Sequence, residues 1–258
     1  MQLSVAVELD YWMEAASDVL LQIEVAALPD QHLDHQSLVV WSDHPIVAVP
    51  GHAGIGQRCV ARADGQFRVA YEALVTIART PADLSSLPAT PLGGLPGDVI
   101  EYLLPSRYVE GDQFEGFVST QFSSLSGGAL AQALVDWTGR NLVYRAGASN
   151  GTTTALTTFA NRSGVCRDYA HLLAALARAG GIPARCVAAY APGVDPPDFH
   201  AVCQLWLAGE WHLVDATGMA RARDLAIVAV GRDATDIAFM TVFGAATLWR
   251  QAVRVAIA

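Results

Sequence analysis

The chain has few charged residues and no cluster of basic ones. Asp, Glu, Lys and Arg make up only 16% of its 258 residues, and the formal net charge at pH 7 is −9. Nonspecific binding to nucleic acid requires clustered Lys and Arg that neutralise phosphates, so we expect no nucleic-acid partner. Hydrophobic residues make up 52% of the chain. This composition is typical of a folded globular protein and excludes a disordered one.

Long apolar runs are also missing. No uninterrupted run reaches the length of about 20 residues that a transmembrane helix requires. The first residues, MQLSV, lack the charged segment followed by an apolar segment that is typical of a secretory signal. We therefore expect a cytoplasmic protein that does not engage a membrane. The sequence leaves its oligomeric state open.

Cysteine is scarce and scattered, because the chain has only four: Cys59, Cys166, Cys186 and Cys203. They are too few for a disulfide framework, and none forms the Cys-x-x-Cys pair of a zinc site. Four histidines fall in the N-terminal part, mostly in turns: His32, His35, His44 and His52. No two of them have helical i, i+4 spacing, so we interpret them as solvated loop residues. We predict no metal and no cofactor.

Two modules are predicted, with a boundary at residue 108. Leu3, Val5, Val7 and Leu9 alternate with polar or small residues, as in a half-buried strand. Asp64-Gly65 predicts a hairpin between residues 57–61 and 67–77. Residues 1–108 are therefore expected to form an antiparallel β-sandwich module that ends in a Pro-rich linker at about residues 80–108. Residues 109–258 mix helical and strand patterns, which makes the expected fold class α+β. Residues 239–257 are expected to complete the sheet of this second module.

Cys166 lies where a cysteine nucleophile would be placed. Ser163 is the expected N-cap of a helix that continues through an apolar stripe and ends at Gly180-Gly181. Cys166 would then occupy the first turn, where the positive end of the helix dipole favours a thiolate. The alternative is a small buried hydrophobic residue, the usual fate of a free cysteine.

His200 and Asp215 supply the remaining parts of a nucleophile–base–carboxylate triad. Residues 199–207 and 211–217 are predicted strands, and Ala208-Gly209 is a two-residue turn between them. In that register Leu207 faces Glu210, and His200 lies diagonally across from Asp215 on the same face. A carboxylate in this position orients the histidine, which then serves as the base for the cysteine. We therefore favour the triad.

Four segments, in this order, resemble the transglutaminase-like superfamily: GVCRDYAH at 164–171, GIPAR at 181–185, DFHA at 198–201 and DAT at 215–217. The match is closest to the bacterial branch of transglutaminase-like cysteine proteases, which also has a β-rich N-terminal region. The resemblance implies a papain-like core. It makes Cys166 the nucleophile, His200 the general base and acid, and Asp215 the residue that orients the histidine. Residues 215–217 depart from the family's common Asp-Pro, which keeps the carboxylate but loses a proline.

The resemblance implies a cysteine-dependent hydrolase, a protease or amidase that acts on a peptide or protein substrate through an acyl-thioester on Cys166. A transglutaminase, which passes the acyl group to an amine, shares the chemistry up to the thioester and stays open. A third alternative is a catalytically idle scaffold that binds peptides. The Cys166 N–H is one expected oxyanion donor. No second donor is evident, since Gln121 and Gln132 are too distant in sequence to assign.

Overall fold

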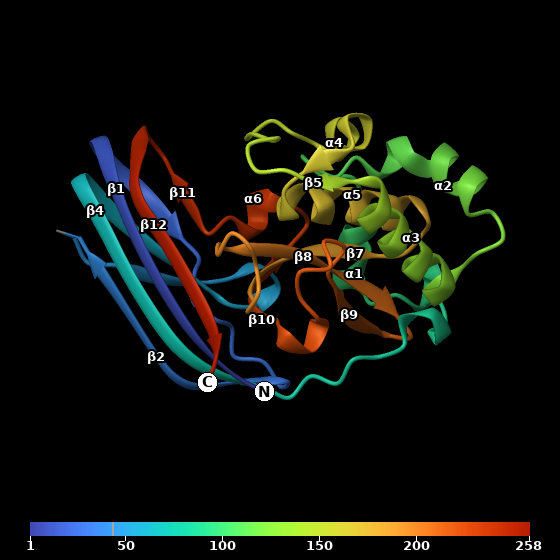
Figure 1. Ribbon diagram of the computed structural model, residues 1–258, viewed down its shortest axis with the longest axis horizontal. Helices are drawn as coiled ribbons and strands as arrows, with labels where there is room; N and C mark the ends of the chain where they lie inside the picture. Colours follow the sequence, from blue (N-terminus) through green and yellow to red (C-terminus); the bar gives the residue numbers. More distant parts are fainter. Residues whose placement is uncertain (43) are drawn as a thin grey trace.

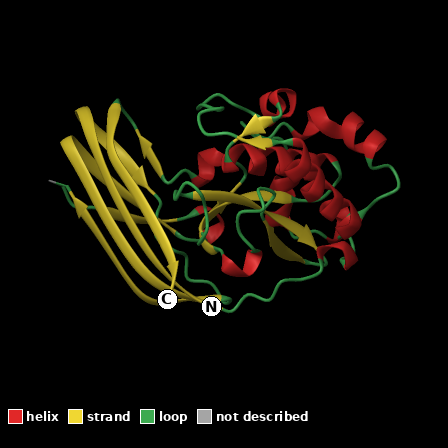
Figure 2. Cartoon of the chain, in the orientation of Figure 1, coloured by secondary structure: helices red, strands yellow, loops and turns green. Residues whose placement is uncertain are grey.

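The computed structural model describes residues 1–42 and 44–258. The chain folds into a strand-rich half and a mixed helical and strand half, which lie side by side (Figures 1 and 2). The expected α+β class, with a strand-rich N-terminal region and a mixed region after it, is confirmed.

The strand-rich half is one antiparallel sheet of six strands. Its strands are β1 (Gln2–Leu21), β2 (Gln31–Trp41), β3 (Val47–Pro50), β4 (Gln57–Ile77), β11 (Met240–Val242) and β12 (Ala246–Ile257). β1 and β4 pair along most of their length. β11 and β12 continue the sheet beyond β1, while β2 and β3 continue it beyond β4. The N-terminal module is therefore antiparallel, as predicted, but its strands form one continuous sheet and not the two packed sheets of a sandwich.

The hairpin predicted at Asp64-Gly65 is wrong, because both residues lie inside the continuous strand β4. The opposite strand contains extra residues between Met13 and Ser17, where the pairing register shifts. Gly65 has a φ of +68°, which a glycine adopts without strain. A glycine in this conformation accommodates a bulge in a strand as well as a turn, so the two long strands bend together and do not reverse.

The mixed half begins after a linker that leaves the lower end of the six-stranded sheet and runs below the mixed half in Figure 1. Its helices are α1 (Gly97–Ile100), α2 (Glu115–Gln121), α3 (Gly127–Asn141), α4 (Ala155–Asn161), α5 (Cys166–Ala179) and α6 (Ala234–Ile237). Its strands are β5 (Val143–Tyr144), β6 (Ser163–Gly164), β7 (Ala184–Tyr190), β8 (His200–Leu207), β9 (Glu210–Val214) and β10 (Ala226–Gly231). β10, β7, β8 and β9 form an antiparallel sheet in that order, and β5 pairs with β6 in parallel.

Helix α5 packs its apolar stripe on β7 and β8, and almost all of its residues are buried. It ends at Gly180, followed by Gly181 with a φ of +73°, as predicted. The expected N-cap is wrong, since the cap is Val165 and Ser163 is held in β6 opposite Val143. The Val165 N–H donates to the Asp168 carboxylate at 2.8 Å. The acidic side chain in the first turn therefore binds the N–H of the cap residue, whereas a serine hydroxyl at the cap would accept an N–H from inside the first turn.

We expected the last two strands to complete the sheet of the mixed half, but this prediction is wrong. β11 and β12 pair with β1 instead, with Val253 opposite Val7 and Val255 opposite Val5. The physical reason is that β1 otherwise presents an unpaired edge. β12 pairs with that edge and places Val253 and Val255 beside Val7 and Val5. β1 and β12 thus both belong to the first sheet. The module boundary at residue 108 stays a prediction.

Buried hydrogen bonds join the two halves. Gln31 is 1% exposed, and its side-chain amide donates to the carbonyls of Ala26 and Ile227 and accepts from the Ile227 N–H, all at 2.7–2.8 Å. The Tyr190 hydroxyl donates to the Ile23 carbonyl at 2.7 Å. β10 and β7 are thereby fixed to the chain that follows β1.

Replacing Gln31 with methionine, which keeps the volume but not the amide, is expected to lower the free energy of unfolding by about 2–4 kcal/mol. The substitution removes three buried hydrogen bonds and leaves the Ile227 N–H without its partner. Chemical denaturation measures the change. Gln66→Met is the matched control, because Gln66 is exposed on β4, and it should cost less than about 0.5 kcal/mol. Equal costs for the two variants would show that these bonds do not stabilise the junction.

Candidate active site

Cys166 is the first residue of helix α5 and is half-buried, whereas the other three cysteines are buried. Its Sγ atom lies 3.9 Å from the carbonyl oxygen of Phe199, the residue before β8. The N-terminus of a helix carries unpaired N–H groups and a partial positive charge, both of which favour a thiolate. Cys166 therefore lies at the N-terminus of a helix, the position that the sequence predicted for it.

His200 and Asp215 are in contact, as predicted. His200 opens β8 and Asp215 follows β9, and the turn between these strands pairs Leu207 with Glu210. His200 Nε2 and Asp215 Oδ2 are 2.9 Å apart. The carboxylate also accepts from the N–H and hydroxyl of Thr217 and from the Ala220 N–H. Four hydrogen bonds therefore fix the carboxylate against the imidazole.

The pair is shielded from water, with the two side chains 0% and 1% exposed. Burial by itself would lower the pKa of His200, but the interactions with Asp215 and with the Cys166 thiol outweigh it and raise the pKa to about 9. Burial would raise the pKa of Asp215, but the hydrogen bond and charge of His200, together with the hydrogen bonds from Thr217, lower it overall. Because Asp215 occupies Nε2, the buried Nδ1 is the ring nitrogen left for the thiol.

Tyr144 also belongs to this group, although the sequence analysis assigned it no role. It ends strand β5, whose parallel pairing places it opposite Gly164, just before the nucleophile helix. Burial and the neighbouring Cys166 raise the pKa of Tyr144 to about 12. The hydroxyl is therefore protonated at neutral pH and is available as a donor beside the thiol.

The two glutamines considered as oxyanion donors lie elsewhere. Gln121 is the exposed last residue of α2, and Gln132 donates to Asp136 on its own helix at 2.8 Å. Neither of these residues lines the pocket that contains Cys166, and Tyr144 does not line it either, so the lining does not decide between them. Proximity to Cys166 instead favours Tyr144. No spacing rule indicates it, because the contact depends on pairing between two strands of two residues each.

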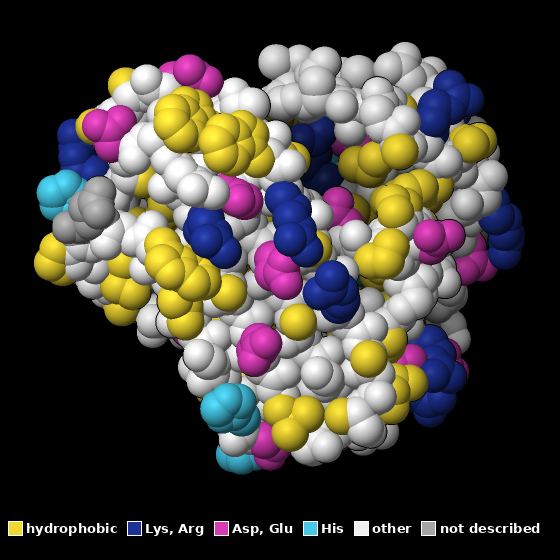
Figure 3. Space-filling view, turned by 60° about the vertical axis from the view of Figure 1, so that its left-hand side comes forward, with side chains coloured by type: hydrophobic (Ala, Val, Ile, Leu, Met, Phe, Trp, Pro, Cys, Tyr) yellow, Lys and Arg dark blue, Asp and Glu magenta, His cyan; other side chains and the backbone are white. Residues whose placement is uncertain are grey.

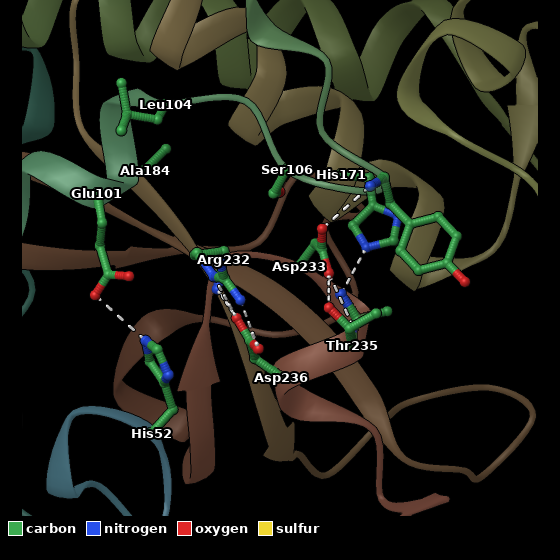
Figure 4. Close-up of polar contacts among 12 residues, drawn as sticks. His52, Glu101, Leu104, Ser106, His171, Ala184, Arg232, Asp233, Thr235 and Asp236 are labelled. Carbon is green, nitrogen blue, oxygen red and sulfur yellow. Dashed lines mark hydrogen bonds and ion pairs between the residues drawn. The ribbon is translucent and has the colours of Figure 1, made fainter.

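Buried polar contacts also connect α5 to neighbouring segments of the chain (Figure 4). Arg178 donates to the carbonyls of Leu104, Ala184 and Arg232, which come from three separate segments. His171 accepts from the Ala234 N–H at 3.0 Å, and burial lowers its pKa to about 3, so its ring is neutral. These contacts anchor the helix whose first residue is Cys166.

Asp233 connects the same cluster to the linker. Its carboxylate accepts from the Tyr108 N–H at 3.1 Å and from the hydroxyl of Thr235. Tyr108 in turn stacks on His171, with ring centroids 5.2 Å apart. The neighbouring Arg232 and Asp236 form an ion pair at 3.0 Å that closes the turn after β10. The linker, the turn and α5 are thus bound into one unit.

Within residues 1–42 and 44–258, no group of three or more His, Cys, Asp or Glu side chains is arranged to hold a metal ion. Over the same residues, no helix is both long enough and apolar enough to cross a membrane.

Comparison with known proteins places this site in a family. The family model of the transglutaminase-like superfamily matches residues 118–216, the segment that contains Cys166, His200 and Asp215. The Mycobacterium leprae protein ML0607 is 32% identical over 114 residues, an alignment that spans 41% of each chain. The crystal structure of a candidate cysteine protease from Cytophaga hutchinsonii superposes with a TM-score of 0.94 at 31% identity, over 99% of this chain and 90% of that one. With likeness over nearly its whole length, the chain belongs to the transglutaminase-like superfamily.

Proposed function

We propose that this protein is a cysteine hydrolase that cleaves peptide or amide bonds through an acyl-thioester on Cys166. The observation that carries the proposal is the arrangement of His200, whose Nε2 is bound to Asp215 while its Nδ1 is left for a thiol at a helix N-terminus. A nucleophile, a base and a group that orients the base are the parts that such chemistry needs.

With a pKa of about 9, His200 is an imidazolium at neutral pH. The proposed nucleophile is Cys166 in its thiolate form, which is the reactive form of a cysteine. The thiolate attacks the amide carbonyl carbon, and the carbonyl oxygen becomes an oxyanion. Collapse of this intermediate breaks the C–N bond, and the proton on Nδ1 passes to the departing amine. Water then attacks the thioester while His200 accepts its proton, and the carboxylic acid leaves as the thiolate is restored.

Two donors are available to the oxyanion in this proposal. One is the backbone N–H of Cys166, which opens helix α5, and the other is the hydroxyl of Tyr144 beside it. Preorganised donors of this kind stabilise the charge that develops in the transition state. The Asp215 carboxylate holds the imidazole orientation and stabilises its positive charge throughout.

Hydrolysis is proposed ahead of transamidation because the relative that matches over 90% of its chain at 31% identity is a candidate cysteine protease. The proposed substrates are peptides or proteins. Both chemistries share the thioester, so the acceptor that releases it distinguishes them.

The first test is the reactivity of Cys166. Iodoacetamide at pH 6 is expected to label the wild type rapidly at one site, because the thiolate paired with imidazolium is the reactive form. Intact-mass spectrometry measures the label. Cys166→Ala should lose it and His200→Gln should slow it at least tenfold, while Cys59→Ala, which removes a buried thiol, should retain it. Slow labelling that rises only near pH 8.5 would favour the idle scaffold.

The same variants extend the test to turnover. A peptide mixture incubated with wild type should yield new carboxylate termini, and Cys166→Ala should yield none. If an added primary amine appears covalently in most products, the protein is a transglutaminase and the hydrolase proposal is wrong.

Tyr144→Phe is expected to lower kcat for amide cleavage by roughly 10²–10³-fold, the usual cost of losing one oxyanion donor. Alkylation by iodoacetamide passes through no oxyanion, so its rate should fall far less than kcat. Steady-state kinetics and mass spectrometry on one preparation provide the comparison. Equal losses in both rates would assign Tyr144 to the thiol and not to the oxyanion.

His200 should make stability depend on pH. Its folded-state pKa lies above its ordinary value, so its contribution is fully present below about pH 6.5 and is lost as pH rises through about 9. The difference in unfolding free energy between wild type and His200→Gln should therefore shrink by roughly 3 kcal/mol between pH 6 and pH 10. Denaturant titrations across this range measure it. A constant difference would mean that the folded protein does not raise this pKa.

A further inference from the structure

We propose that the cavity beside Cys166 and His200 receives one bulky apolar side chain of the substrate, and that the strand-rich half of the chain builds part of its wall. This inference rests on the proposed function, since it takes Cys166 as the reacting group. It adds the chemical class of the substrate and a role for the N-terminal sheet.

The cavity is apolar. Cys166 and His200 lie at one side of it, and its wall includes small or apolar side chains from the four-stranded sheet, notably Ala188, Ala201 and Val228. Its volume is about 190 Å³, more than the roughly 150 Å³ of an apolar protein cavity that binds benzene. A phenyl ring or a branched aliphatic side chain therefore fits it.

Arg167 and Asp198, two charged groups that touch the cavity, each have polar partners elsewhere, although the buried Nε of Arg167 has none among the described residues. Arg167 donates to the Asn150 carbonyl at 2.7 Å and pairs with Asp168 at 3.2 Å. Asp198 accepts from Gln251 at 2.6 Å and from the Phe199 N–H at 2.8 Å. A charged substrate side chain would have to break these contacts and lose its hydration, whereas an apolar one would only displace water.

The opposite wall comes from the junction with the first sheet. Phe239 precedes β11, and its ring stacks on Phe199 with centroids 4.2 Å apart. Gln22 follows β1, and its backbone N–H donates to the Phe239 carbonyl at 2.8 Å. The Gln22 amide is engaged by Arg58 and by the Asp236 carbonyl, so this residue braces the wall. Figure 1 shows α6 between the six-stranded sheet and the helices, where this wall is formed.

Exposed apolar side chains elsewhere lack this enclosure. Trp12 and Trp249 stack on the outer part of the first sheet, and Figure 3 shows such hydrophobic groups separated by charged side chains. The cavity at Cys166 is distinguished by its apolar wall and by the thiol that lines it.

The test uses three chloroacetamides that differ only in the N-substituent: benzyl, methyl and carboxymethyl. Rates of Cys166 labelling are measured by intact mass and divided by the rate of each reagent with glutathione. The benzyl reagent is expected to react about 10- to 200-fold faster than the other two, the range typical of an apolar pocket. Equal rates, or a preference for carboxymethyl, would overturn the proposal.

Two variants locate the preference. Ala188→Leu fills the cavity and should reduce the benzyl-to-methyl ratio at least tenfold. Phe239→Ala enlarges the cavity and should raise the labelling rate of a naphthylmethyl chloroacetamide relative to that of the benzyl reagent. Ala246→Leu, at an exposed position in β12, is the control and should keep the wild-type ratio. A benzyl preference that neither cavity variant alters would place the ring elsewhere and overturn the proposal.

Alkylation requires no turnover, so the two proposals fail separately. Slow labelling of wild type by iodoacetamide at pH 6 would contradict the hydrolase mechanism. A lost benzyl preference with fast iodoacetamide labelling would contradict only the apolar pocket.

Discussion

The burial of helix α5 is the constraint on which the site depends. A helix enclosed on nearly all sides can carry polar residues only if their groups find partners inside the protein. Arg178 meets this requirement by donating to carbonyls of three segments, and Asp168 by accepting the Val165 N–H. These bonds fix the position of the helix and of its first turn. The thiol of Cys166 is consequently placed by the core and not by a loop.

The sequence predicted those parts of the site that local patterns encode. The apolar stripe and the two glycines gave the extent of α5, and the two-residue turn at Ala208-Gly209 gave the register that brings His200 to Asp215. Both rest on short-range rules, the helical period and the strand period joined by a tight turn. The fold class followed from the same patterns, together with the resemblance to a family.

Features that depend on pairing between distant segments escaped prediction. Tyr144 approaches Cys166 through two strands of two residues each, too short to show a period. Asp64-Gly65 has the composition of a turn, but extra residues of β1 lie opposite it, so the two strands bend there and do not reverse. The valines of β12 alternate as any strand's would, and alternation does not say which sheet they join. In each case the partner, which the local residues do not specify, decided the outcome.

The return of β11 and β12 to the first strand has a consequence for biosynthesis. β1 is made before the mixed half, and one of its edges waits for partners that are made after that half. Phe239, which closes the wall of the cavity, sits on the same late segment. A nascent chain can therefore carry Cys166, His200 and Asp215 before the cavity beside them is complete. The order of synthesis therefore delays an assembled site until β11 and β12 have been translated.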